Sequence, residues 1–92
     1  MATIEILVKG ATRGARVLWD AQPKSLKKTD SGFAATFQAD AGTHVYVVSV
    51  SGDPGEKWSV KVKGGKKTFN HAGHMSPGGL DTTGDTPYEV KQ

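Results

Sequence analysis

The sequence predicts an all-β fold, an antiparallel β-sandwich of about seven short strands. Apolar and polar residues alternate along most of the chain, which is the period of a strand with one buried face. Turn signals rich in glycine, proline and aspartate separate these segments at regular intervals. The 92 residues include 12 glycines, and glycine disfavours helix interiors by about 1 kcal/mol relative to alanine. A small closed β-barrel is the alternative architecture.

Seven segments carry the strand pattern. They are residues 3–8, 15–20, 33–37, 43–51, 57–63, 66–71 and 87–90. The fourth contains the unbroken apolar run from Val45 to Val48, which predicts a central strand with a covered outer face or a strand in an interface. Residues 23–30 are mostly polar and have room for one helical turn.

A chain of this size forms one core, so residues 1–92 are expected to be a single β domain. The regular spacing of turns is interrupted at residues 70–86, which predict one long loop rich in glycine and proline. Such a loop is either a mobile surface segment or a functional one. The strand number is similar to that of immunoglobulin-like sandwiches by analogy, although the chain has no cysteine to join the sheets.

The pair Gly64-Gly65 predicts a two-residue hairpin turn, in which Val60 faces Phe69. This register separates an apolar face from a lysine face. The apolar face holds Trp58, Val60, Val62, Phe69 and His71. The other face holds Ser59, Lys61, Lys63, Lys66, Thr68 and Asn70. We therefore expect Trp58, Val60 and Phe69 in the core and the lysines outside it.

The net charge of +3 is mild, but residues 57–67 contain five lysines and no acid. One interpretation is a solvated surface that discourages edge-to-edge pairing of sheets. The other is a site for an anionic ligand, such as nucleic acid or a charged glycan. The candidate contact residues are Lys61, Lys63, Lys66 and Lys67.

Residues 71–75 form the one sequence cluster with metal-ligand chemistry. The imidazoles of His71 and His74 are close in sequence and can share a metal with a nearby aspartate. Zinc needs three or four protein ligands, and nothing in the sequence fixes the third. We therefore expect no metal site and no cofactor, with His71 and His74 as weak candidates. His74 and Met75 are also predicted to contact a partner from the long loop.

Catalytic motifs and a cysteine nucleophile are absent from the sequence, which predicts a protein that is not an enzyme. A signal sequence and an apolar stretch of ~20 residues are also absent, which predicts a cytoplasmic protein without membrane insertion. Export by a signal-independent route is the alternative. The predicted function is a module that binds another protein through a sheet face or through residues 70–86. Binding of an anionic ligand is the second hypothesis, and binding of a metal is the third.

Overall fold

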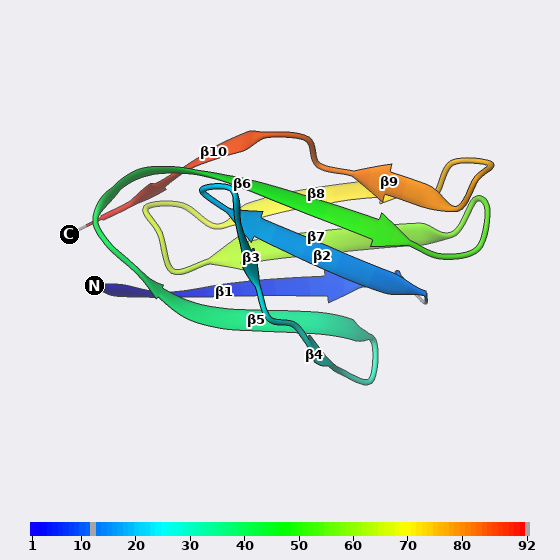
Figure 1. Cartoon of the computed structure of the whole chain (residues 1–92), viewed down its shortest axis with the longest axis horizontal. Helices are drawn as coiled ribbons and strands as arrows, with labels where there is room; N and C mark the ends of the chain where they lie inside the picture. Colours follow the sequence, from blue (N-terminus) through cyan, green and yellow to red (C-terminus); the bar gives the residue numbers. More distant parts are fainter. Residues whose placement is uncertain (12, 92) are drawn as a thin grey trace.

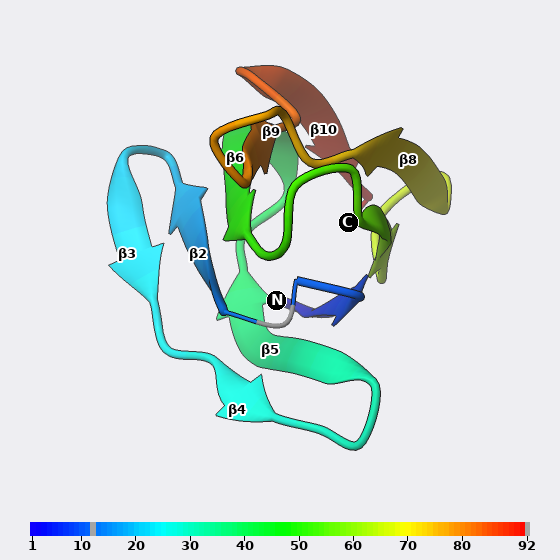
Figure 2. The same ribbon diagram turned by 90° about the vertical axis from the view of Figure 1, so that its right-hand side faces the viewer.

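The chain folds into β-strands, as the sequence predicts. The computed structural model describes residues 1–11 and 13–91, and within them ten strands form two antiparallel sheets without any helix. Figure 1 shows the long strands of both sheets running roughly along the long axis of the molecule, with the short β3 and β4 crossing it. Figure 2 shows the two layers facing each other. The architecture is sandwich-like, and no described strand pair joins the sheets into the closed barrel of the alternative.

The two sheets have five strands each. Sheet A has the order β4 (Lys27–Lys28), β5 (Gly32–Ala39), β1 (Ala2–Lys9), β7 (Lys57–Lys63) and β8 (Phe69–His74). Sheet B has the order β10 (Thr86–Val90), β6 (Gly42–Ser51), β2 (Gly14–Trp19) and β3 (Gln22–Lys24), with β9 (Leu80–Thr82) also on β6. Strands β10 and β9 pair with successive parts of β6, so they share one edge of sheet B.

The alternating apolar residues of both sheets meet between the layers and form the core. Each fully buried valine or isoleucine contributes about 1.5–3 kcal/mol relative to an exposed one. The largest fully buried side chains are Tyr46, Ile4, Ile6, Val8, Val17, Val48 and Val62. The period-two pattern therefore places one face of each long strand inside and leaves the other face outside.

The prediction of one long loop at residues 70–86 is wrong. Strand β8 extends to His74, and β9 pairs with β6 in the register Leu80 to Ser51. The carboxylate of Asp81 accepts a hydrogen bond from the Trp58 indole at 2.8 Å, which holds β9 beside β7. These contacts join segments far apart in sequence. The glycine content of residues 70–86 indicates a loop because it carries no information about such pairing. Residues 23–30, which have room for one helical turn, instead contain the end of β3 and all of β4.

The register of the hairpin after β7 differs from the predicted one by two residues. Phe69 pairs with Val62, whereas the prediction places it opposite Val60. The turn is held by the last strand, since the Tyr88 hydroxyl accepts from the Gly65 amide at 2.9 Å. The same hydroxyl donates to the Lys67 carbonyl at 2.7 Å. A shift of two residues preserves the faces of a strand, so the predicted separation of apolar and lysine faces is confirmed.

Trp58 and Val60 are buried as predicted, and Lys61 and Lys66 are exposed as predicted. The prediction that Phe69 is a core residue is wrong, because 37% of its surface is exposed. In the observed register Phe69 occupies the first position of β8, beside the turn. Its ring contacts the edge of a buried tyrosine at a centroid distance of 6.1 Å and otherwise reaches the surface.

The tyrosine in that contact, Tyr46, is fully buried in the core. Its hydroxyl forms no hydrogen bond of ordinary geometry with any described residue. Burial raises the pKa of Tyr46 to about 12, and the neighbouring Thr86 offsets this only in part. The Tyr46 hydroxyl is therefore a buried polar group that costs stability, in contrast to the hydrogen-bonded hydroxyl of Tyr88.

Replacing Tyr46 with phenylalanine should leave the free energy of unfolding unchanged or raise it by about 1 kcal/mol, because an unsatisfied buried group is removed. The matched Tyr88→Phe variant should lose about 1–3 kcal/mol, because its hydroxyl ties down the turn after β7. Urea unfolding of both variants measures the difference. A loss in Tyr46→Phe as large as that in Tyr88→Phe would show that the Tyr46 hydroxyl is well bonded in solution.

Candidate binding surfaces

The outer face of sheet B carries a continuous row of apolar side chains. Cross-strand pairing places Val47 beside Leu18, and Leu18 beside Pro23, while Val45 lies beside Pro87. We call these five residues the apolar row. The expected central position of β6 is confirmed, but Val45 keeps 42% of its surface exposed, so the described chain leaves it largely uncovered.

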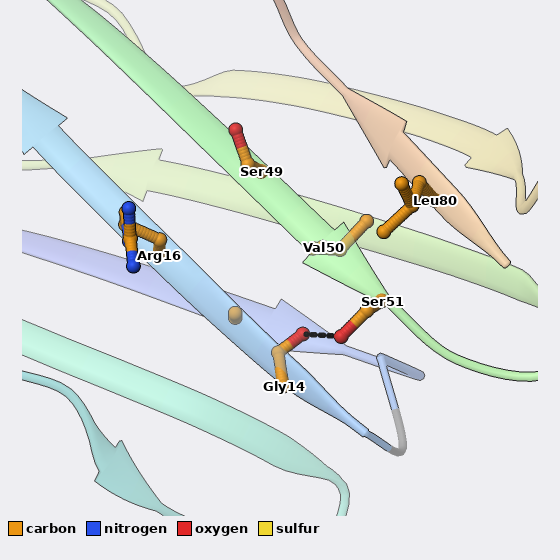
Figure 3. Close-up of a pocket in the computed structure, with 7 residues that line it drawn as sticks. Gly14, Arg16, Ser49, Val50, Ser51 and Leu80 are labelled. Carbon is orange, nitrogen blue, oxygen red and sulfur yellow. Dashed lines mark hydrogen bonds between the residues drawn. The ribbon is translucent and has the colours of Figure 1, made fainter.

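A shallow groove of ≈ 340 Å³ adjoins the apolar row, between β2, β6 and β9 (Figure 3). Arg16 and Ser49 are paired across its floor, and Leu80 forms the far wall with 61% of its surface exposed. Ser51 donates to the Gly14 carbonyl at 3.4 Å along the same floor. The groove therefore combines an exposed leucine, two hydroxyl groups and a guanidinium, which are the elements of a mixed polar and apolar contact.

The sequence predicts only the β6 part of this surface and not the side chains that β2 and β9 contribute. The run from Val45 to Val48 gave the one available signal, because it is apolar on both faces of its strand. Arg16, Leu18 and Leu80 gave no signal of their own. They lie on separate segments, and only the pairing of β2 and β9 with β6 brings them together.

The outer face of sheet A has a different chemistry, because lysines dominate it. Its outward strand positions carry five lysines and one acidic residue. The net charge of this face is therefore +4, which exceeds the net charge of +3 of the whole chain. We call this set the lysine face. It consists of Lys9, Lys27, Lys57, Lys61, Lys63 and Glu5. Lys63 pairs with Glu5 at 3.2 Å, which leaves the other four lysines to attract anions.

The four predicted lysine contacts are divided between two places. Lys61 and Lys63 lie on the lysine face, where Lys61 borders a depression of ≈ 430 Å³. Lys66 and Lys67 lie in the turn after β7 and border a separate pocket of ≈ 270 Å³ together with Phe69. Lys66 also pairs with a carboxylate of β10 at 3.4 Å. The four predicted contact lysines therefore form two separate groups and not one cluster.

The predicted histidine pair is also divided. His71 and His74 are three residues apart on one strand, so their side chains point to opposite faces of β8. The His71 ring lies against Trp58 at a centroid distance of 5.4 Å, whereas His74 is exposed. Met75 is only 3% exposed and packs in the core. The His74 side chain is therefore accessible at the surface, whereas that of Met75 is not.

Comparison with protein-family models, with curated proteins and with solved structures finds no match to this chain. The described part of the chain has no helix with the length and apolar character to cross a membrane.

His44 forms a polar cluster that the sequence did not predict. Its Nδ1 lies 2.6 Å from a carboxylate oxygen of Asp20, and its Nε2 lies 2.7 Å from the carbonyl oxygen of Asp40. Both partners are acceptors, so the doubly protonated imidazolium satisfies the arrangement in full. The hydrogen bond from His44 lowers the pKa of Asp20, and the same bond raises the pKa of His44. Trp19 stacks on the ring at 5.0 Å, so the cluster fastens the β2–β3 turn to β6.

The contribution of this cluster to stability should depend on pH in a defined way. It is fully present below the ordinary His44 pKa of 6.5 and is lost as pH rises through the raised pKa. At the acid end it is lost as pH falls through the lowered pKa of Asp20. The Asp20→Asn variant should therefore have a His44 pKa closer to 6.5 and a smaller loss of stability between about pH 6 and about pH 9.

An NMR titration of the His44 ring, combined with urea unfolding at the two pH values, tests this expectation. Asp53→Asn is the control, because Asp53 belongs to an exposed ion pair with Arg13 elsewhere on the surface. An unchanged His44 pKa in Asp20→Asn would contradict the assigned cause.

Proposed function

We propose that this protein is a non-enzymatic binding module that contacts another protein through the outer face of sheet B. The observation that carries the proposal is the apolar row, which continues across β3, β2, β6 and β10. Pro23, Val45 and Pro87 are exposed, and Leu18 and Val47 between them are half-buried. Exposed apolar side chains that adjoin one another mark interaction sites, whereas scattered ones need no explanation. Burial of this row against a partner supplies the driving force for association.

The groove beside the apolar row supplies specificity in this proposal. Arg16 is exposed and has no ion-pair partner among the described residues. Arginine is enriched at protein interfaces, where its planar group binds a carboxylate through two hydrogen bonds. Leu80 brings the segment 70–86 to the same surface. The two contact regions expected from the sequence, a sheet face and residues 70–86, therefore adjoin in this proposal. A partner with an apolar patch beside a carboxylate fits this surface.

Two further features belong to the proposal. A cytoplasmic location is consistent with the lack of cysteine in the chain. The immunoglobulin-like analogy rests on the sandwich arrangement and the number of strands, and it implies no particular ligand.

Introducing a charge in the apolar row should weaken partner binding without unfolding the protein. Val47→Glu places a carboxylate in the centre of the row, and binding should weaken by at least about tenfold because that charge loses water at the interface. Leu7→Glu is the matched control, since Leu7 is equally half-buried but lies on the outer face of sheet A. Thermal unfolding of both variants checks that the fold is retained.

Immobilised wild-type protein and the two variants would be incubated with the same native lysate, and retained proteins identified by mass spectrometry. We expect at least one protein that is retained by the wild type and by Leu7→Glu but lost from Val47→Glu. A retained set that Val47→Glu leaves unchanged, or that Leu7→Glu removes instead, would overturn the proposed surface.

Binding of an anionic ligand is a second candidate function, favoured by the concentration of positive charge on the lysine face. The apolar and lysine surfaces lie on opposite sides of the sandwich, so the two functions do not exclude each other. The lysine face has no aromatic side chain at its outward positions, so electrostatic attraction supplies the affinity.

Single-stranded DNA is a suitable probe of this second function, with binding measured by fluorescence anisotropy across a range of salt. The affinity should fall steeply with salt, and Lys61→Gln should reduce the slope of log affinity against log salt by about 1. Lys28→Gln is the control, because Lys28 lies on β4 but points away from the lysine face. Binding that does not respond to salt, or that Lys28→Gln alters as much, would exclude this role.

A further inference from the structure

The free strand edges of the sandwich are not equally protected against pairing with another strand. Edges are normally blunted by short length, proline or lysine. Strand β4 consists of two lysines, β3 has three residues that include Pro23, and β10 contains Pro87 beside the three-residue β9. Among the strands that end the two sheets, β8 is the exception, because it has six residues without proline or lysine. The edge of β8 therefore differs from those of the other terminal strands in being open to a further strand.

The main chain of β8 has the groups that such a strand needs. The amide of Met75 donates to the Glu56 carbonyl at 2.8 Å and continues the ladder between β7 and β8. Because antiparallel ladders alternate, every second residue of β8 bonds to β7 and the others point to the free edge. The outward groups are those of Asn70, Ala72 and His74. These three residues are exposed, and no described main-chain group pairs with their edge.

The side chains beside this edge indicate which strand fits it. On the outer face, Lys61 lies next to Asn70 and Lys57 lies next to His74. An added strand would lie two strand spacings from β7, about 10 Å, which is about one Debye length at 0.1 M salt, so these lysines attract acidic side chains on it most strongly at low salt. On the inner face, the exposed part of Phe69 offers an apolar contact. The added strand should therefore carry acidic side chains on one face and apolar side chains on the other.

We propose that β8 is a strand-addition site for an extended peptide segment that alternates acidic with apolar residues. Main-chain hydrogen bonds at Asn70, Ala72 and His74 supply affinity, and the lysines behind them select acidic sequences. The site uses the lysine face and does not use the apolar row of sheet B. Its failure therefore leaves the proposed protein contact through sheet B untouched, and the reverse also holds.

The test uses a short acetylated peptide that alternates valine with glutamate and threonine, added to the full chain. Its control peptide has the same charge but proline in place of alternate valines, so it cannot add as a strand. We expect the first peptide to bind, to protect the amides of Asn70, Ala72 and His74 from hydrogen exchange, and to bind at least about tenfold more tightly than the control. Equal binding of both peptides would mean that charge alone attracts them, as it would a nucleic acid or glycan, and would overturn the proposal.

Two variants locate the site on β8. Ala72→Pro removes one outward amide and should weaken binding of the alternating peptide by about tenfold, because an edge strand accepts proline at such a position. If this variant does not fold, Lys57→Glu combined with Lys61→Glu tests the charge selection and should weaken binding by a similar factor. Lys28→Glu, on the opposite edge of sheet A, is the control and should change affinity less than about twofold. Amide protection outside β8, or variants that leave binding unchanged, would refute the site.

Discussion

The burial of one face of each sheet against the other is the constraint on which this structure depends. Every second residue of the long strands fills the space between the layers. Examples are Ile4 and Ile6 on β1 and Tyr46 and Val48 on β6. Because successive side chains of a strand point to opposite faces, burial of these residues fixes what the intervening positions present to solvent. The chemistry of the two outer faces is therefore free to differ while the core stays common to both.

The two outer faces differ in the way expected of a molecule with more than one contact surface. Sheet B presents valines, a leucine and prolines, and it has a groove with an arginine at its side. Sheet A presents lysines and small residues around a shallow depression. The open edge of β8 borders the lysine face, so the proposed strand addition and the proposed attraction of anions would act at one place. An apolar partner on one side and an acidic segment on the other would be bound without competition.

Two neighbouring polar clusters hold one end of the sandwich in addition to the apolar core, since Tyr88 and His44 are cross-strand partners. The Tyr88 hydroxyl binds the turn after β7 and so connects the last strand to sheet A. His44 and Asp20 fasten the β2–β3 turn to β6, beside the aromatic ring of Trp19. Both clusters join segments far apart in the chain. They restrain turns that glycine and short strands would otherwise leave loose.

The sequence by itself determined the fold class, the main long strands, the burial of Trp58 and Val60, and the separation of lysines from the core. These features follow from period-two alternation, which is a local property of the chain. Only the tertiary structure decided the register of β8 and the exposure of Phe69, because the preceding turn is hydrogen-bonded to Tyr88 of another strand. It also decided that His71 and His74 diverge and that Leu80 joins Arg16 in one groove. Such outcomes depend on pairing between distant segments, which no local pattern specifies.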